Sequence, residues 1–148
     1  MMDVNQKLAE ALDAFRNGDF SLARDFAGAI QRKHPGEPGS LRILGQIDYL
    51  EGNIEGAVTA LCASLKTKPD QYSIWVKLGN AYTDLGDFSK SEAAYTSALE
   101  YSKDPHLGLL GRAQTRALMG KLEEAWSDLD QVVISNPSLG QTYRLMIK

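Results

Sequence analysis

The chain has 148 residues, a formal net charge of −3 and a sequence pI near 5.4. This length suits one domain, and the slight acidity excludes a strong global attraction to nucleic acid or to an anionic membrane. A single cysteine excludes an internal disulfide, and no apolar run approaches the roughly 18 residues that predict a membrane span. Since the first residues also lack a basic segment followed by an apolar run, we expect a cytoplasmic protein with no membrane insertion.

The first segment predicts two helices, near 3–17 and 20–33, joined by a turn at Gly18. Asp19 is suited to cap the second helix, because a carboxylate can accept hydrogen bonds from the free N–H groups of the first turn. A run rich in proline and glycine at 34–39 ends that helix. The apolar residues of the first helix share one face, at i, i+4 and i+7: Leu8, Leu12 and Phe15.

The second and third segments follow the same plan. Gly52 makes the turn of the second segment, and Asn53 is the expected N-cap of its second helix. In the third segment, Gly86 ends the first helix because glycine adopts left-handed backbone angles at little cost, and 89–92 is a candidate capping box. Gly79 has no side chain, so a second helix can come close on its face. The large residues of that face recur at i, i+3 and i+7: Trp75, Leu78 and Tyr82.

In the fourth segment, Arg112 and Arg116 occupy the positions at which the third segment has leucine and tyrosine. We expect their aliphatic stems to cover the groove between helices while their guanidinium groups reach solvent. Asp104 and Pro105 are expected to cap and begin the first helix of this segment. Apolar residues near the end of the chain predict a further amphipathic helix over 139–148: Leu139, Tyr143, Met146 and Ile147.

All four segments share a 34-residue period, which the turn glycines show best: Gly18, Gly52, Gly86 and Gly120. A large apolar residue stands two positions after each glycine, and a small residue stands five positions after it. The chain therefore resembles the tetratricopeptide repeat (TPR) family, whose unit is a 34-residue helix–turn–helix. The resemblance implies an all-α solenoid in one domain, 1–148, in which the helix at 139–148 either caps the stack or begins a fifth repeat. The four repeats fall at about 4–37, 38–71, 72–105 and 106–139.

The sequence contains no constellation that predicts catalysis, a metal site or a cofactor. His34 and His106 stand beside turns, without a cysteine or histidine partner at metal-ligand spacing. Cys62 lacks a neighbouring base and is interpreted as a small buried hydrophobe. Glu123 and Glu124 suit an exposed helix start, where the helix dipole favours negative charge. We therefore expect a protein that is not an enzyme.

In the family that this chain resembles, the first helices of successive repeats line a concave groove. One equivalent position carries an amide side chain in three repeats: Gln46, Asn80 and Gln114. Amides both donate and accept hydrogen bonds, which suits an extended peptide, although ordinary solvated polar residues give the same pattern. The resemblance implies a peptide-binding groove with these residues: Arg42, Gln46, Tyr49, Lys77, Asn80, Asp84, Leu110 and Gln114.

Hydrogen bonds alone cannot hold such a peptide. One nets about 0.5–1.5 kcal/mol, whereas micromolar affinity needs roughly 8 kcal/mol. We therefore expect apolar anchors, for which the candidates are Leu8, Phe15, Tyr49, Leu107 and Leu110. Some family members bind the C-terminal carboxylate of chaperones through a clamp of lysine, asparagine and arginine, and this chain does not reproduce that set.

The resemblance implies an adaptor or scaffold that binds a peptide or helix of a partner protein in the concave groove, and no nucleic acid. Two alternatives stay open. The terminal helices can pair between chains, which makes the protein a self-associating structural element and a homodimer. The chain can also be the N-terminal recruiting domain of a larger enzyme such as a transferase.

Overall fold

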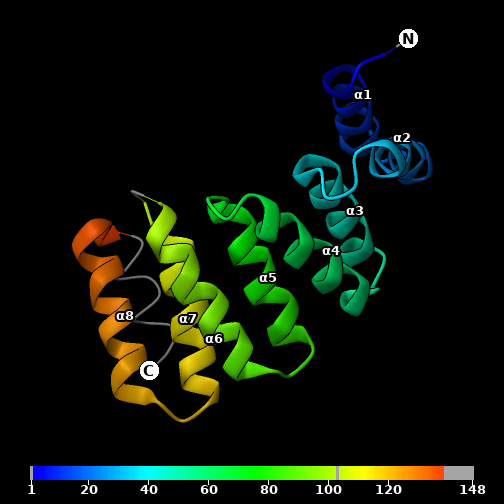
Figure 1. The fold of residues 1–148 in the computed structure, drawn as a ribbon. Coiled ribbons are helices and arrows are strands. Elements are labelled where there is room, and N and C mark those ends of the chain that lie inside the picture. Colours follow the sequence, from blue (N-terminus) through cyan, green and yellow to red (C-terminus); the bar gives the residue numbers. More distant parts are fainter. Residues whose placement is uncertain (1, 103, 139–148) are drawn as a thin grey trace. The chain divides into compact units, whose positions relative to one another are not determined.

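The computed structural model describes residues 2–102 and 104–138, and these contain helices, turns and loops without a strand. The all-α prediction is therefore confirmed, whereas the predicted helix at 139–148 lies outside the described residues. The chain divides into two compact units, Met1–Asp70 and Gln71–Lys148 (Figure 1).

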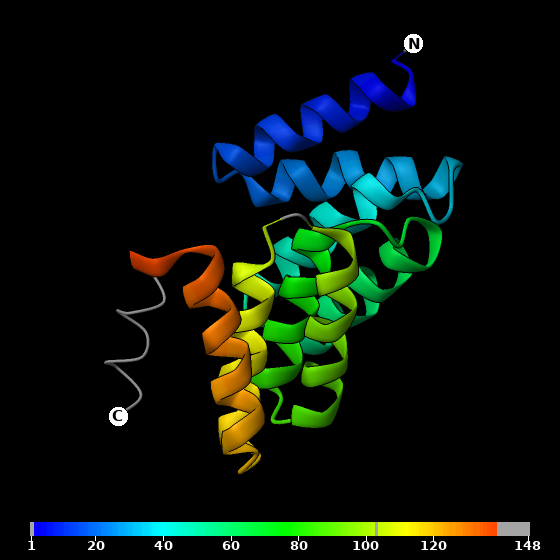
Figure 2. The same cartoon turned by 90° about the vertical axis from the view of Figure 1, so that its left-hand side faces the viewer.

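Each unit contains two helix–turn–helix pairs. The first unit has α1 (Val4–Arg16), α2 (Phe20–Lys33), α3 (Pro38–Leu50) and α4 (Ile54–Thr67). The second has α5 (Tyr72–Asp84), α6 (Phe88–Ala98) with the short 3₁₀ turn η1 (Leu99–Tyr101), α7 (His106–Leu118) and α8 (Leu122–Ser135). Within each pair the two helices lie side by side, as α1 and α2 show in blue in Figure 2. Equivalent helices begin 34 residues apart, at the spacing that the sequence predicts.

The turns inside the pairs all use a glycine with positive φ, from 77° at Gly86 to 85° at Gly52. In the first turn, the N–H of Gly18 donates to the carbonyl of Phe15, and the N–H of Asp19 donates to Ala14 at 2.9 Å. These bonds satisfy carbonyls that the end of α1 leaves open. The Asp19 carboxylate then accepts from the Leu22 N–H at 3.1 Å, so one residue closes α1 and starts α2, as predicted. Asn53 does the same at the start of α4.

Two predicted caps in the second unit are wrong. The side chain of Asp87 caps α6 by accepting from the Lys90 N–H. The predicted capping box at 89–92 does not form, because the helix begins at Phe88 and Ser89 therefore lies inside it. Pro105, not Asp104, is the N-cap residue of α7, and the Asp104 carboxylate lies 2.8 Å from Nδ1 of His106. The Glu92 and Asp104 carboxylates thus pair with the side chains of Arg116 and His106 instead of capping a helix.

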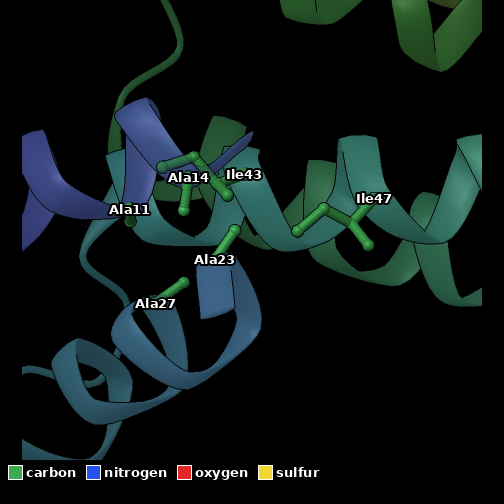
Figure 3. Packing of buried hydrophobic residues seen from close by; sticks show 6 residues of the cluster. All are labelled: Ala11, Ala14, Ala23, Ala27, Ile43 and Ile47. Carbon is green, nitrogen blue, oxygen red and sulfur yellow. The ribbon is translucent and has the colours of Figure 1, made fainter. Parts of the chain in front are cut away.

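Small residues bring the helices of the first unit together. The core cluster contains alanines from α1 and α2 and two isoleucines from α3 (Figure 3): Ala11, Ala14, Ala23, Ala27, Ile43 and Ile47. Because alanine adds little bulk, the helix backbones approach closely enough for the isoleucines to fill the remaining space. Leu8, Leu12 and Phe15 pack against this cluster and are partly buried by it. The apolar face predicted for pairing between chains is therefore used in part inside the unit.

Candidate binding surface on the first helices

The predicted groove residues of the first unit lie on one face of α3. Arg42, Gln46 and Tyr49 follow one another at i, i+4 and i+7, and all three are half-buried. The Glu37 carboxylate caps this helix by accepting from the N–H groups of Gly39 and Ser40. Burial alone raises the pKa of Glu37, but the hydrogen bonds from Ser40 and Gly39 and the charge of Arg42 outweigh it and lower that pKa. The start of this face is thus held by an ionised cap.

In the second unit, Lys77, Asn80 and Asp84 form an exposed row on α5, at i, i+3 and i+7. Gln114 is exposed on the neighbouring helix α7, so the structure brings these polar residues onto adjacent helices. Leu110 differs from expectation, because it is 9% exposed and belongs to the core cluster of α7 and α8. It packs the core and is not available as the predicted anchor.

The apolar side chains that α7 does expose flank Gln114. Leu107 is 52% exposed and Leu118 is 61% exposed. With Gly111 and Gln114 they recur at i, i+4, i+7 and i+11, which places them along one face of the helix. Leu107 was among the anchors expected from the sequence. The surface on α5 and α7 therefore combines polar residues in its middle with leucines at both ends of α7.

Tyr95 reaches this surface from α6. Its hydroxyl donates a hydrogen bond to Oδ1 of Asn80, while its ring is buried. A Cβ atom at Gly79 would lie 2.6 Å from the ring and one at Gly111 only 2.4 Å, so both glycines are needed to admit it. The sequence signal was present, since a large aromatic residue and two glycines stand at helix-contact positions, but nothing local says which of them meet.

The two arginines of α7 do not reach solvent as predicted. Arg112 donates to both oxygens of the Asp128 carboxylate, at 2.6 and 3.0 Å, and Arg116 donates to the same carboxylate at 2.9 Å. Arg116 also donates to Glu92 at 2.8 Å, and Lys121 donates to the other Glu92 oxygen at 3.1 Å. The side chain of Asp128 is only 1% exposed, and those of Arg112 and Arg116 are 12% and 17% exposed. A buried ion network thus joins α6, α7 and α8.

The physical reason for this difference is that a buried charge needs a partner. Arg116 stands where the third repeat has Tyr82. Its guanidinium group contacts α6, the second helix of the preceding pair, and binds Glu92 there. The hydrogen bond from Arg116 lowers the pKa of Glu92, against burial, which raises it, and Lys121 adds to the lowering. The opposing carboxylates are 16 and 24 residues away, beyond the reach of any local pattern.

The first unit contains the same junction with the charges exchanged. Arg24 on α2 donates to Asp48 on α3 at 2.6 Å and to Glu51 at 3.2 Å. Arg24 and Glu92 occupy the same position of their repeats, as do Asp48 and Arg116, and each pair is 24 residues apart. The two junctions therefore use opposite signs at one structural position.

Among residues 2–102 and 104–138, no group of three or more histidine, cysteine, aspartate or glutamate side chains is arranged to hold a metal ion. Cys62 is half-buried, and His34 is exposed at the end of α2. No helix within the described residues is both long enough and apolar enough to cross a membrane.

Two family models match the chain, and both are described as tetratricopeptide repeat. One matches residues 8–73 and the other residues 72–105. The chain is 27% identical over 86 residues to the human Superkiller complex protein 3, and this match covers 57% of this chain and 6% of that protein. It is 27% identical over 124 residues to the Bos taurus DnaJ homolog subfamily C member 3, covering 83% of this chain and 25% of that protein. The chain thus spans at most a quarter of the length of these relatives.

Solved structures share the fold. MamA has a TM-score of 0.85 at 15% identity, with 94% of this chain and 81% of MamA covered. A tetratricopeptide repeat protein from Parabacteroides merdae has a TM-score of 0.82 at 21% identity, with 93% and 57% covered. An O-GlcNAc transferase from Thermobaculum terrenum has a TM-score of 0.69 at 23% identity, with 78% of this chain and 23% of the transferase covered. At these identities the likeness concerns the fold alone.

Proposed function

Because this chain belongs to the tetratricopeptide repeat family, whose repeats form protein–protein interaction scaffolds, we propose that it binds a peptide or helix of a partner protein through the exposed faces of its first helices. The observation that carries the proposal is the surface on α5 and α7. There Lys77, Asn80, Asp84 and Gln114 are exposed on the adjacent helices α5 and α7.

The chemistry of this surface suits a peptide better than a small molecule. Its side chains include donors, acceptors and charges of both signs, which match the alternating carbonyl and N–H groups of a backbone. The exposed leucines at both ends of α7, Leu107 and Leu118, provide the apolar contact area that hydrogen bonds cannot replace. In this proposal they take the anchoring role first expected of Leu110.

The face of α3 in the first unit is proposed as a second contact region. Arg42, Gln46 and Tyr49 offer a cation, an amide and an aromatic ring on one side of the helix. A ligand held on either face uses residues of one unit only, so each face can be tested by itself.

The test is an affinity capture from cell lysate, read by mass spectrometry. The first bait is a variant with Lys77→Ala, Asn80→Ala and Gln114→Ala. The wild-type chain is used as a second bait in a parallel capture. A matched control carries three substitutions on the outward face of α8, where all three residues are exposed: Glu123→Ala, Ser127→Ala and Gln131→Ala. We expect partners captured by wild type and by the control to be lost from the first bait. Identical captures by all three baits would show that the α5–α7 surface does not bind them.

The resemblance to part of an O-GlcNAc transferase favours one further role. In that reading, this chain is the recruiting portion of a larger enzyme and presents a bound protein to a catalytic domain elsewhere. The relatives, of which the chain spans only a small part, are compatible with it. The complete open reading frame decides this point, because a recruiting domain requires a catalytic domain in the same polypeptide.

A further inference from the structure

Tyr95 has a polar group that helix packing does not require. The equivalent residue of the second repeat is Leu61, which packs against Gly45 as Tyr95 packs against Gly79. A Cβ at Gly45 would lie 2.9 Å from Leu61, so an apolar side chain closes the same gap. The tyrosine adds a hydroxyl group, and that hydroxyl meets the candidate binding surface.

The hydroxyl is held in place by its surroundings. The ring lies against Gly79 on α5 and Gly111 on α7, so neither helix leaves it room to swing. One turn earlier on α6, the Ser91 hydroxyl lies 2.6 Å from that of Thr83 and 3.1 Å from that of Thr115, which links the three helices. The tyrosine is thus a rigid support and not a surface side chain.

The direction of the hydrogen bond determines what Asn80 can offer to a ligand. Burial raises the pKa of the Tyr95 hydroxyl, so this group keeps its proton and donates to Oδ1 of Asn80. The amide oxygen then faces Tyr95, which leaves the two N–H donors of Nδ2 for other partners, and Asn80 is exposed on α5. Because the oxygen is turned toward Tyr95, the Nδ2 donors are the groups that Asn80 offers to a ligand.

We propose that Tyr95 is a positioning residue of the binding surface, which fixes Asn80 as a hydrogen-bond donor and so selects a ligand that places a backbone carbonyl oxygen against α5. This inference rests on the proposed function and names the atom that the surface recognises. Tyr95 acts through Asn80 and does not touch the ligand. The preorganised amide spares the ligand the entropy of ordering that side chain.

The first experiment needs no ligand. The Asn80 side-chain amide is assigned by NMR in wild type, in Tyr95→Phe and in the control Tyr101→Phe, which removes an exposed hydroxyl. We expect the Nδ2 order parameter to be the same in wild type and in the control, and clearly lower in Tyr95→Phe. Equal values in wild type and Tyr95→Phe would overturn the positioning role. Phenylalanine keeps the ring between the two glycines, and circular dichroism verifies that each variant is folded.

The second experiment uses a random dodecapeptide library displayed on phage and selected on the wild-type chain. The selected peptide is synthesised, and its affinity is measured by fluorescence anisotropy. We expect Tyr95→Phe to weaken binding about three- to tenfold and Tyr101→Phe to leave it unchanged. Asn80→Asp still accepts from Tyr95 but turns an oxygen toward the ligand, so a loss of about tenfold or more is expected.

The outcomes separate the two proposals. If the library yields no binder that competes for the α5–α7 surface, the proposed peptide-binding function fails, while the NMR result still decides the role of Tyr95. If a peptide binds this surface and Tyr95→Phe binds it as tightly as wild type does, the selection by Asn80 orientation is wrong. Retained affinity in Asn80→Asp would likewise contradict a donor role for this residue.

Discussion

Replacing Asp128 with asparagine tests the buried ion network of the second unit. The carboxylate is 1% exposed and accepts three hydrogen bonds, two from Arg112 and one from Arg116. Asparagine has nearly the same shape but no charge. Its amide nitrogen also turns donors toward guanidinium N–H groups that are donors themselves. Both arginines would then remain largely buried without their shared counterion.

The magnitude follows from this geometry. Removing one partner of a buried ion pair costs about 3–5 kcal/mol, because the other charge stays desolvated and uncompensated. Glu92 still neutralises part of the charge on Arg116, so we expect Asp128→Asn to fall near the lower end of that range. For a chain of this size, that loss lowers the melting temperature by about 6–12 °C.

Urea unfolding followed by circular dichroism measures this loss. The control is Glu124→Gln, whose carboxylate lies 3.7 Å from Arg116 but is 56% exposed, so its removal should cost less than about 1 kcal/mol. An Asp128→Asn variant within 1 kcal/mol of wild type, at an unchanged slope of free energy against urea, would refute the reasoning.

A compensating variant tests whether the cost comes from uncompensated charge. The third repeat has Leu78, Tyr82 and Ala94 at the positions of Arg112, Arg116 and Asp128. Placing those three residues in the fourth repeat leaves no buried charge without a partner, since Glu92 and Lys121 still pair with each other. We expect a stability equal to wild type or higher, because apolar packing often matches or exceeds a buried ion pair. A triple variant less stable than Asp128→Asn would contradict this explanation.

Three further predictions follow from single features. Arg24→Glu should destabilise the first unit, and adding Asp48→Arg should recover most of that loss in a double-mutant cycle, since the exchanged pair reproduces the junction of the second unit. The lowered pKa of Glu92 means that its contribution to stability is present above the ordinary value near 4.5 and is lost as pH falls through the lower, folded-state pKa. Urea midpoints measured from pH 6 downward should therefore fall less steeply in Glu92→Gln than in wild type. Gly52→Ala should cost about 1 kcal/mol by thermal unfolding, because φ is 85° there while no atom lies within 4 Å of the added methyl group.

The repeat architecture is predictable from the sequence because its determinants are local. A glycine with positive φ, the N–H bonds that close the helix before it and the side chain that caps the next helix all lie within about six residues. Asp19 and Asn53 illustrate this, since each closes one helix and starts another as expected. The 34-residue spacing of such turns then identifies the family.

The candidate binding surface and the ion network depend on contacts that sequence spacing does not reveal. The sequence predicts solvent-exposed guanidinium groups at Arg112 and Arg116, but the packing of α6 and α8 against α7 places carboxylates beside them. The sequence predicts Leu110 as an apolar anchor for a bound peptide, but this side chain is buried in the core of α7 and α8. The orientation of the Asn80 amide is set by a tyrosine fifteen residues away on another helix. Local backbone energetics thus determine where the helices begin and end, whereas the partner of each charged or polar side chain is decided only when helices distant in sequence pack together.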